Sequence, residues 1–142
     1  MYIKYYLLLL IFVLNISQVA YANETEYNQS TAELKKVTGQ DTWEGLWNSY
    51  LSKAAVKNEN KYQENKDTIR IASVSENAFV FFTKNSNPAH PSFAKVFLRT
   101  VDGQMKLSTF TYTWGDIPSY KKWISSEVHD FSRAIARKLN KR

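Results

Sequence analysis

The chain of 142 residues contains no cysteine, and it has only two histidines and four glycines. Without cysteine it forms no disulfide, no cysteine-ligated zinc site or iron–sulfur cluster, and no thiol nucleophile. Its few glycines supply neither a phosphate-binding loop nor a dinucleotide-binding fingerprint, and no Gly-x-Ser-x-Gly elbow surrounds any serine. These absences favour a non-enzymatic protein, and we expect no cofactor and no metal ion.

Long hydrophobic runs are also missing beyond the N-terminus. Met1–Lys4 carries one positive charge, Tyr5–Leu14 is an apolar run of 10 residues, and Ala20–Ala22 reads Ala-Tyr-Ala. This order is typical of a secretory signal peptide, and the run is about half of what a membrane span needs. The alternative is an uncleaved anchor, against which the polar residues just before Ala20 argue. We predict cleavage after Ala22.

The remaining 120 residues, 44% hydrophobic over the whole chain, are enough for one globular domain. We expect an exported protein, periplasmic if the source is Gram-negative and otherwise secreted, with no transmembrane span after cleavage. Residues 23–40 are predicted to form a loose polar arm, and residues 41–142 a single domain. A short helical turn over Thr31–Val37 is the one regular feature expected in the arm.

Apolar spacing predicts a helix at each end of the domain. Asp41, with Glu44 three residues later, resembles a capping box, and it precedes an amphipathic helix over Thr42–Lys57 with both tryptophans on its buried face. Pro118 suits the first turn of a last helix. That helix runs to the C-terminus and buries residues at a spacing of three to four.

Between the helices, four segments read as strands: Thr68–Val74, Ala78–Thr83, Phe93–Val101 and Gln104–Trp114. The connections are short, and Asp102-Gly103 is a strong hairpin signal. We therefore predict an α+β fold in the order α-β-β-β-β-α, with a four-stranded antiparallel meander.

A two-residue turn at Asp102-Gly103 sets the register of the last hairpin. It places Leu98 opposite Leu107 on an aliphatic face, and Phe93 opposite Tyr112 on a face that mixes aromatic and basic side chains. Arg99 then opposes Lys106, which is unfavourable and leaves a shifted register open. In one interpretation each face is covered by one helix. In the other, both helices cover the aliphatic face and the aromatic face binds a ligand.

Two further features suggest binding surfaces. The segment Asn85–Pro91 has two prolines, which make it a stiff loop with His90 facing solvent, and stiff loops lose little entropy on binding. The last 22 residues hold seven basic and two acidic side chains, so they carry the whole excess positive charge. These cations either stabilise the helix end and keep the protein soluble, or attract anionic envelope material.

The sequence favours an exported, non-enzymatic binding protein of the cell envelope, most simply a protein–protein interaction module of an inhibitor or immunity type. The alternative is a module that binds a glycan or an anionic amphiphile, and a small envelope hydrolase using Asp102, Asp116 and His90 is the least favoured. The partner is expected to be another exported or envelope protein, and not nucleic acid. The predicted binding residues are Asn85, Asn87, His90, Phe93, Lys95, Phe97, Arg99, Tyr112, Trp114, Arg133 and Arg137.

Overall fold

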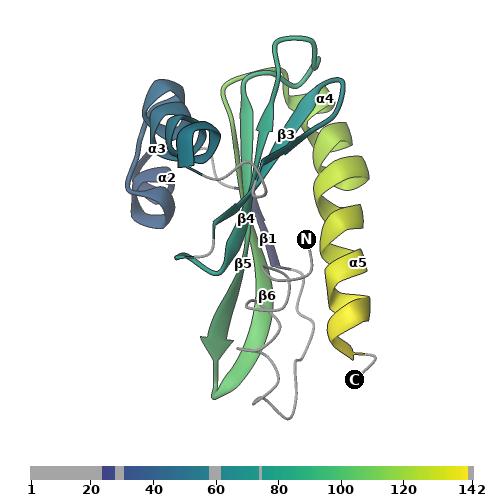
Figure 1. Ribbon diagram of the computed structural model, residues 1–142. Helices are drawn as coiled ribbons and strands as arrows, with labels where there is room; N and C mark the ends of the chain where they lie inside the picture. The colour runs from purple at the N-terminus through teal and green to yellow at the C-terminus, as the bar shows by residue number, and fades with distance from the viewer. Residues whose placement is uncertain (1–23, 28–30, 58–61, 74, 141–142) are drawn as a thin grey trace.

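The computed structural model describes residues 24–27, 31–57, 62–73 and 75–140 (Figure 1). The predicted leader, residues 1–22, lies outside the described residues, so its cleavage stays a prediction. The elements follow one another in the order β1, α2, α3, β2, β3, β4, β5, β6, α4, η2 and α5.

The sheet has six strands in the order β1-β6-β5-β4-β3-β2. Five of them, β2 to β6, form the antiparallel meander, and β1 lies parallel to β6 at the edge. The bounds are β1 Glu24–Tyr27, β2 Tyr62–Glu64, β3 Thr68–Ser73, β4 Ala78–Thr83, β5 Ser92–Val101 and β6 Gln104–Thr113. The antiparallel α+β prediction is confirmed, but four strands is wrong, because the two short edge strands have no apolar alternation of their own.

The predicted register of the last hairpin is confirmed. Leu98 pairs with Leu107 and Phe93 with Tyr112, and the turn residues Asp102 and Gly103 have φ of 52° and 75°, as a type I′ turn requires. Arg99 does oppose Lys106. The Arg99 Nε donates to Ser108 Oγ at 2.6 Å, so the guanidinium bonds diagonally across to β6, two residues along that strand from Lys106.

The N-terminal side of the domain holds two helices, α2 Thr31–Thr38 and α3 Trp43–Lys57. The short helical turn predicted over Thr31–Val37 is confirmed as α2. Its Leu34 is fully buried, and Glu24–Tyr27 forms β1, so the described part of residues 23–40 is packed and is not a loose arm. Gly39 ends α2 with φ of 76°. The N-cap of α3 is Thr42 and not Asp41, since Thr42 Oγ1 accepts from the Gly45 N–H at 3.0 Å.

The predicted C-terminal helix comprises α4 Ile117–Trp123, a π-helical turn η2 Ile124–Val128, and α5 His129–Asn140. Asp116 caps it by accepting from the Ser119 N–H. In η2 the His129 N–H bonds to the carbonyl of Ile124, five residues back, while Ser125 and Ser126 donate to the Lys122 carbonyl. No helix in the described ranges is long and apolar enough to cross a membrane.

Each face of the sheet is covered by helices, as Figure 1 shows. The aromatic face, with Phe93 and Phe110, packs under α2 and α3 through Leu34, Leu46 and Leu51. The aliphatic face packs under α4, η2 and α5; its core includes Val96, Leu107, Trp123, Ile124 and Val128. The interpretation with helices on both faces is therefore confirmed, and the one that left the aromatic face open is wrong. Burying the phenyl rings is the more favourable arrangement.

Replacing either of two threonines on β6 with valine should have opposite effects on stability. Thr109 Oγ1 is buried and has no hydrogen-bond partner among the described residues, whereas Thr111 Oγ1 accepts from the Tyr120 hydroxyl. Thr109→Val removes an unsatisfied hydroxyl, so we expect the free energy of unfolding to rise by about 1 kcal/mol. Thr111→Val removes the Thr111 acceptor of the Tyr120 hydroxyl and should lower the free energy of unfolding by a similar amount. Urea denaturation measures both, and equal effects would contradict the assignment.

Candidate functional site

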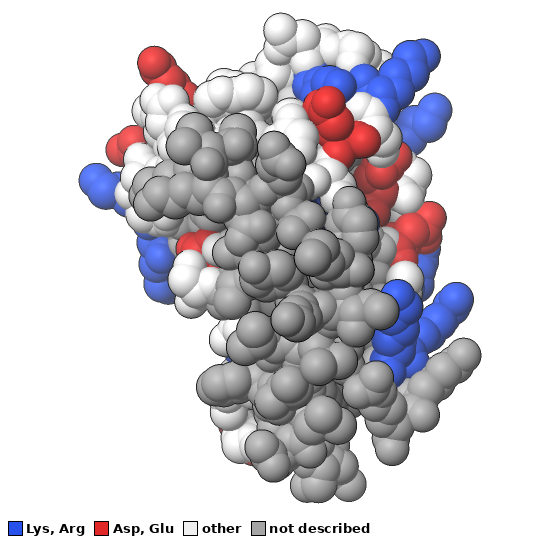
Figure 2. Space-filling view, in the orientation of Figure 1, with Lys and Arg blue, Asp and Glu red and all other residues white. Residues whose placement is uncertain are grey.

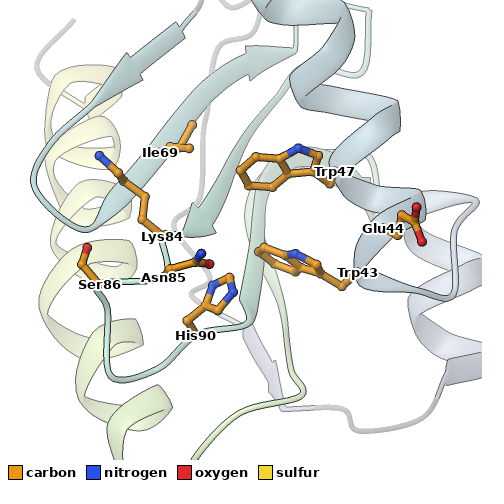
Figure 3. A pocket seen from close by; sticks show the side chains of 8 residues that line it. All are labelled: Trp43, Glu44, Trp47, Ile69, Lys84, Asn85, Ser86 and His90. Atoms are coloured by element: carbon orange, nitrogen blue, oxygen red, sulfur yellow. The ribbon is translucent and has the colours of Figure 1, made fainter.

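A pocket of about 690 Å³ opens between α3 and the loop that joins β4 to β5. Figure 3 shows the rings of Trp43 and Trp47 on the α3 side, and Ile69 and Asn85 across the pocket from them. The full lining is Trp43, Glu44, Trp47, Ile69, Lys84, Asn85, Ser86 and His90. Its volume lies within the range of about 300–1,000 Å³ typical of ligand sites.

The two tryptophans occur one helical turn apart on α3, so their rings are neighbours, with centroids 5.8 Å apart. Trp43 is half-buried, and its ring meets Phe82 and His90 edge-on at 5.5 and 5.1 Å. Trp47 is 37% exposed, so the prediction that both tryptophans face the core is wrong for it. Trp43 thus anchors the helix, and Trp47 leaves an apolar surface exposed at the pocket.

The facing wall is the loop of residues 84–91, which is held by hydrogen bonds to the β2–β3 turn and by others within the loop. The Lys84 N–H donates to the Asp67 carbonyl at 2.8 Å, and the Ser86 hydroxyl donates to the Lys66 carbonyl at 3.1 Å. Asn87, a predicted binding residue, is 8% exposed, and its side chain bonds within the loop to Ala89 N–H. Asn87 therefore shapes the loop, whereas Asn85 is exposed at the pocket.

His90 is half-buried at the base of the pocket, and the expectation that it faces solvent freely is wrong. Its Nδ1 lies 2.9 Å from the Thr83 carbonyl oxygen. A carbonyl only accepts, so in the neutral ring Nδ1 carries the proton and Nε2 is an acceptor. The ring is thereby fixed against Trp43, joining the loop to α3.

The hydroxyl groups near His90 are structural. Thr83 and Ser92 are fully buried. Thr83 Oγ1 accepts from the Ser92 N–H at 2.8 Å and donates to the Ser92 carbonyl, and the Ser92 hydroxyl donates to the Ala89 carbonyl. Gly115 passes so close that an added Cβ would lie 2.7 Å from the His90 carbonyl oxygen. Neither hydroxyl can reach a substrate, so this cluster does not provide a nucleophile.

Lys95, another predicted binding residue, lies under the N-terminal helices. Its side chain is 8% exposed, and its Nζ contacts Glu76 Oε1 at 2.9 Å and the Val37 carbonyl at 3.2 Å. Glu76 also accepts from the hydroxyls of Tyr50 at 3.0 Å and Ser73 at 2.7 Å. This polar cluster (Lys95, Glu76, Tyr50, Ser73 and the Val37 carbonyl) connects α2, α3, β5 and the β3–β4 turn.

The cluster shifts the pKa values of Glu76 and Tyr50. Burial alone would raise the pKa of Glu76, but the hydrogen bonds from Lys95, Ser73 and Tyr50, together with the Lys95 charge, outweigh it and lower that pKa. Burial raises the pKa of Tyr50, and the Glu76 charge and hydrogen bond raise it further. The cluster therefore holds Glu76 as a carboxylate and Tyr50 as a neutral phenol at neutral pH.

The other predicted binding residues are scattered over the fold. Phe93 and Tyr112 are buried, and Phe97 is half-buried against the same core. Trp114 is 36% exposed and meets Trp43 and Tyr112 edge-on. It lies beside the pocket without lining it. Among the predicted residues, the structure brings Asn85 and His90 together at the pocket.

The basic C-terminal helix lies on the opposite side of the sheet from the pocket. Arg133 and Arg137 are exposed on α5, and Arg133 forms an ion pair with Asp130. Basic side chains are visible in Figure 2 on the α5 side, at right, and also on the α2 side, at left, where Lys35 and Lys36 are exposed. The positive surface is therefore divided between two sides, and α5 does not extend the pocket.

The lining residues that sequence reasoning missed are Trp43, Glu44, Trp47, Ile69, Lys84 and Ser86. The sequence held no signal that separates the two tryptophans, because residues four apart lie on the same face of a helix and Trp47 falls within the arc set by Leu46 and Leu51.

Comparison of the chain with protein families, with curated proteins and with solved structures finds no match in any of the three. The site is therefore interpreted from its own geometry.

The polar cluster predicts an asymmetric response to mutation. Glu76→Gln leaves the Lys95 ammonium buried without an anion, and we expect it to lower the free energy of unfolding by about 2 kcal/mol. The figure lies below the roughly 3–5 kcal/mol of a fully buried pair because Glu76 is 33% exposed. Lys95→Met removes the buried charge itself and should cost less. Urea denaturation at neutral pH measures both.

The pH dependence gives a second readout of Glu76→Gln. Since the folded-state pKa of Glu76 is lowered, its anion stabilises the fold above the ordinary carboxyl range, and this contribution is lost as pH falls through the folded-state pKa. The free energy of unfolding of Glu76→Gln should therefore decrease less on acidification than that of the unchanged protein. The matched control is Glu64→Gln, which breaks the exposed pair with Lys84 at 3.4 Å and should cost less than about 0.5 kcal/mol. Equal costs for the two variants would contradict the role of the cluster.

Proposed function

We propose that this chain is an exported, non-enzymatic binding protein of the cell envelope, and that it recognises another protein through the pocket between α3 and the β4–β5 loop. The single observation that carries the proposal is the exposure of Trp47 at a pocket whose walls are held rigidly. Export is proposed from the leader-like pattern of residues 1–22.

The chemistry of the pocket supports a protein partner. Tryptophan is among the residues most enriched at the energetic centres of protein interfaces, where an apolar contact is surrounded by polar groups that exclude water. Here the Trp43–Trp47 pair forms the apolar part, and Lys84, Asn85 and Ser86 lie along the opposite wall. The wall and the tryptophans are joined through His90, so binding orders few additional groups.

A glycan is the second candidate. Trp47 and Trp114 are the two exposed large hydrophobic side chains of the described residues, and flat aromatic faces stack on sugar rings. A glycan site of this kind needs Trp47 and Trp114 on one binding surface. Of these two, Trp47 lines the pocket and Trp114 does not.

We expect Trp47→Ala to weaken partner binding by about thirtyfold or more, the loss of a typical interface centre. The tagged protein, expressed with its own leader in its native host, is cross-linked and purified, and the captured proteins are identified by mass spectrometry. Two controls are matched: Trp114→Ala removes an equally exposed tryptophan outside the pocket, and Arg137→Ala removes an exposed cation from α5. Circular dichroism verifies that each variant is folded.

One dominant protein that is retained by both controls and lost with Trp47→Ala supports the proposal. The same protein retained by Trp47→Ala but lost with Arg137→Ala would move the site to the basic helix. A bound glycan in place of a protein would favour the second candidate.

A further inference from the structure

The two charged side chains that line the pocket do not direct their charges into it. Lys84 Nζ lies 3.4 Å from Glu64 Oε2 and donates to the Asn65 carbonyl at 3.1 Å, so its aliphatic stem faces the pocket while its charge is compensated outside. In Figure 3 the Glu44 carboxylate points away from the other lining side chains. The pocket is therefore close to neutral inside, and it selects against a ligand that carries a charge into it.

Asn85 is the polar side chain left for a ligand. It is exposed, its side-chain amide has no hydrogen bond to any other described residue, and Figure 3 places it between Ile69 and His90, facing the tryptophans. The Ser86 hydroxyl, by contrast, is used by the Lys66 carbonyl. A primary amide offers one acceptor and two donors, which is the complement of a peptide group.

The remaining walls are apolar on two opposite sides, with the Trp43–Trp47 pair facing Ile69. A sugar ring carries hydroxyls around its whole edge, and Ile69 and the Lys84 stem would leave several of them without partners, which is costly. An extended peptide carries one apolar side chain and a peptide group that is separate from it. The pocket matches that pattern, with the side chain between the apolar walls and the peptide group at Asn85.

We propose that the pocket binds a short, neutral, extended peptide segment of the partner, with an aromatic or large aliphatic side chain between the tryptophan pair and Ile69, and with a backbone peptide group paired to the Asn85 side-chain amide. This inference rests on the proposed function and names the chemistry of its partner. The pocket volume of about 690 Å³ is that of a drug-sized ligand, so a stretch of a few residues fits.

The test uses the indole N–H signals of the four tryptophans in ¹⁵N-labelled protein purified after expression with its own leader. Tryptophan-to-phenylalanine variants assign the signals. Trp123 is an internal control, because its Nε1 donates to Thr68 Oγ1 at 3.1 Å in the buried core on the other face. The probes are the capped tripeptides with a central phenylalanine, serine or glutamate between alanines, and the trimer of N-acetylglucosamine.

The expected result is a saturable shift of the Trp43 and Trp47 signals with the phenylalanine peptide in the millimolar range, and no shift of Trp123. The serine and glutamate peptides should bind at least about fivefold more weakly. Stronger binding of the sugar trimer than of the phenylalanine peptide overturns the ligand class. No shift with any probe overturns the pocket as a peptide site. Both results are independent of whether the cross-linking experiment captures a partner.

Variants of Asn85 separate the amide pairing from plain apolar contact. Asn85→Leu keeps the branching and the number of side-chain heavy atoms and removes both hydrogen-bonding functions, and Asn85→Asp keeps the shape and replaces the donor with a charge. We expect both to weaken the phenylalanine peptide by about fivefold or more, the loss of one net hydrogen bond. Unchanged or tighter binding by Asn85→Leu overturns the amide pairing. Asn87→Leu is no substitute, because Asn87 is buried in the loop.

Discussion

The arrangement of the N-terminal half depends on one buried cation. Lys95 lies in the middle of β5, on a face otherwise built from aromatic and aliphatic side chains. A lone ammonium there would be very unfavourable, so it requires the Glu76 carboxylate and the Val37 carbonyl in fixed positions. Those partners fix where the β3–β4 turn and the end of α2 lie, and Tyr50 extends the same constraint to α3.

The position of the α3 wall of the pocket depends on that constraint. Tyr50 stands on α3 one turn after Trp47, and its ring packs against Phe82 and Phe93. The position of the tryptophan pair over the sheet is therefore set by a polar cluster and an aromatic core together. The facing loop is fixed separately, through Asp67 and His90. Two rigid walls of separate origin meet at one opening.

The central sheet was predictable because its signals are local. The β-branched and aromatic run Ala78–Thr83 and the Asp102-Gly103 turn determine strands and register from neighbouring residues alone. The edge strands β1 and β2 were missed because their pairing is decided by the strands they join. Thr42 was missed as the cap since Asp41 beside it has the same capping chemistry.

The candidate site was predictable only in part. The sequence predicted a stiff loop around His90 from its prolines, whereas the structure holds the loop by hydrogen bonds to Asp67, Lys66 and Thr83. Asn85 was named among the binding residues. Lys95 was misjudged because a basic residue in a strand reads as exposed, and its burial depends on Glu76, 19 residues away in the chain. The facing tryptophans come from a helix that the chain forms more than thirty residues earlier, and no pattern along the sequence places them against that loop.

The π-helical turn between α4 and α5 also bears on how this chain tolerates changes of length. Such a turn accommodates a single extra residue within an otherwise regular helix, and here two serine hydroxyls satisfy the carbonyl that it leaves behind. Trp123 before it and Ser132 after it both reach the sheet side and are buried. A variant of this chain with one residue deleted at this point would keep the same packing in an unbroken helix, so the chain can change its length by one residue here without moving Trp123 or Ser132 from the sheet side.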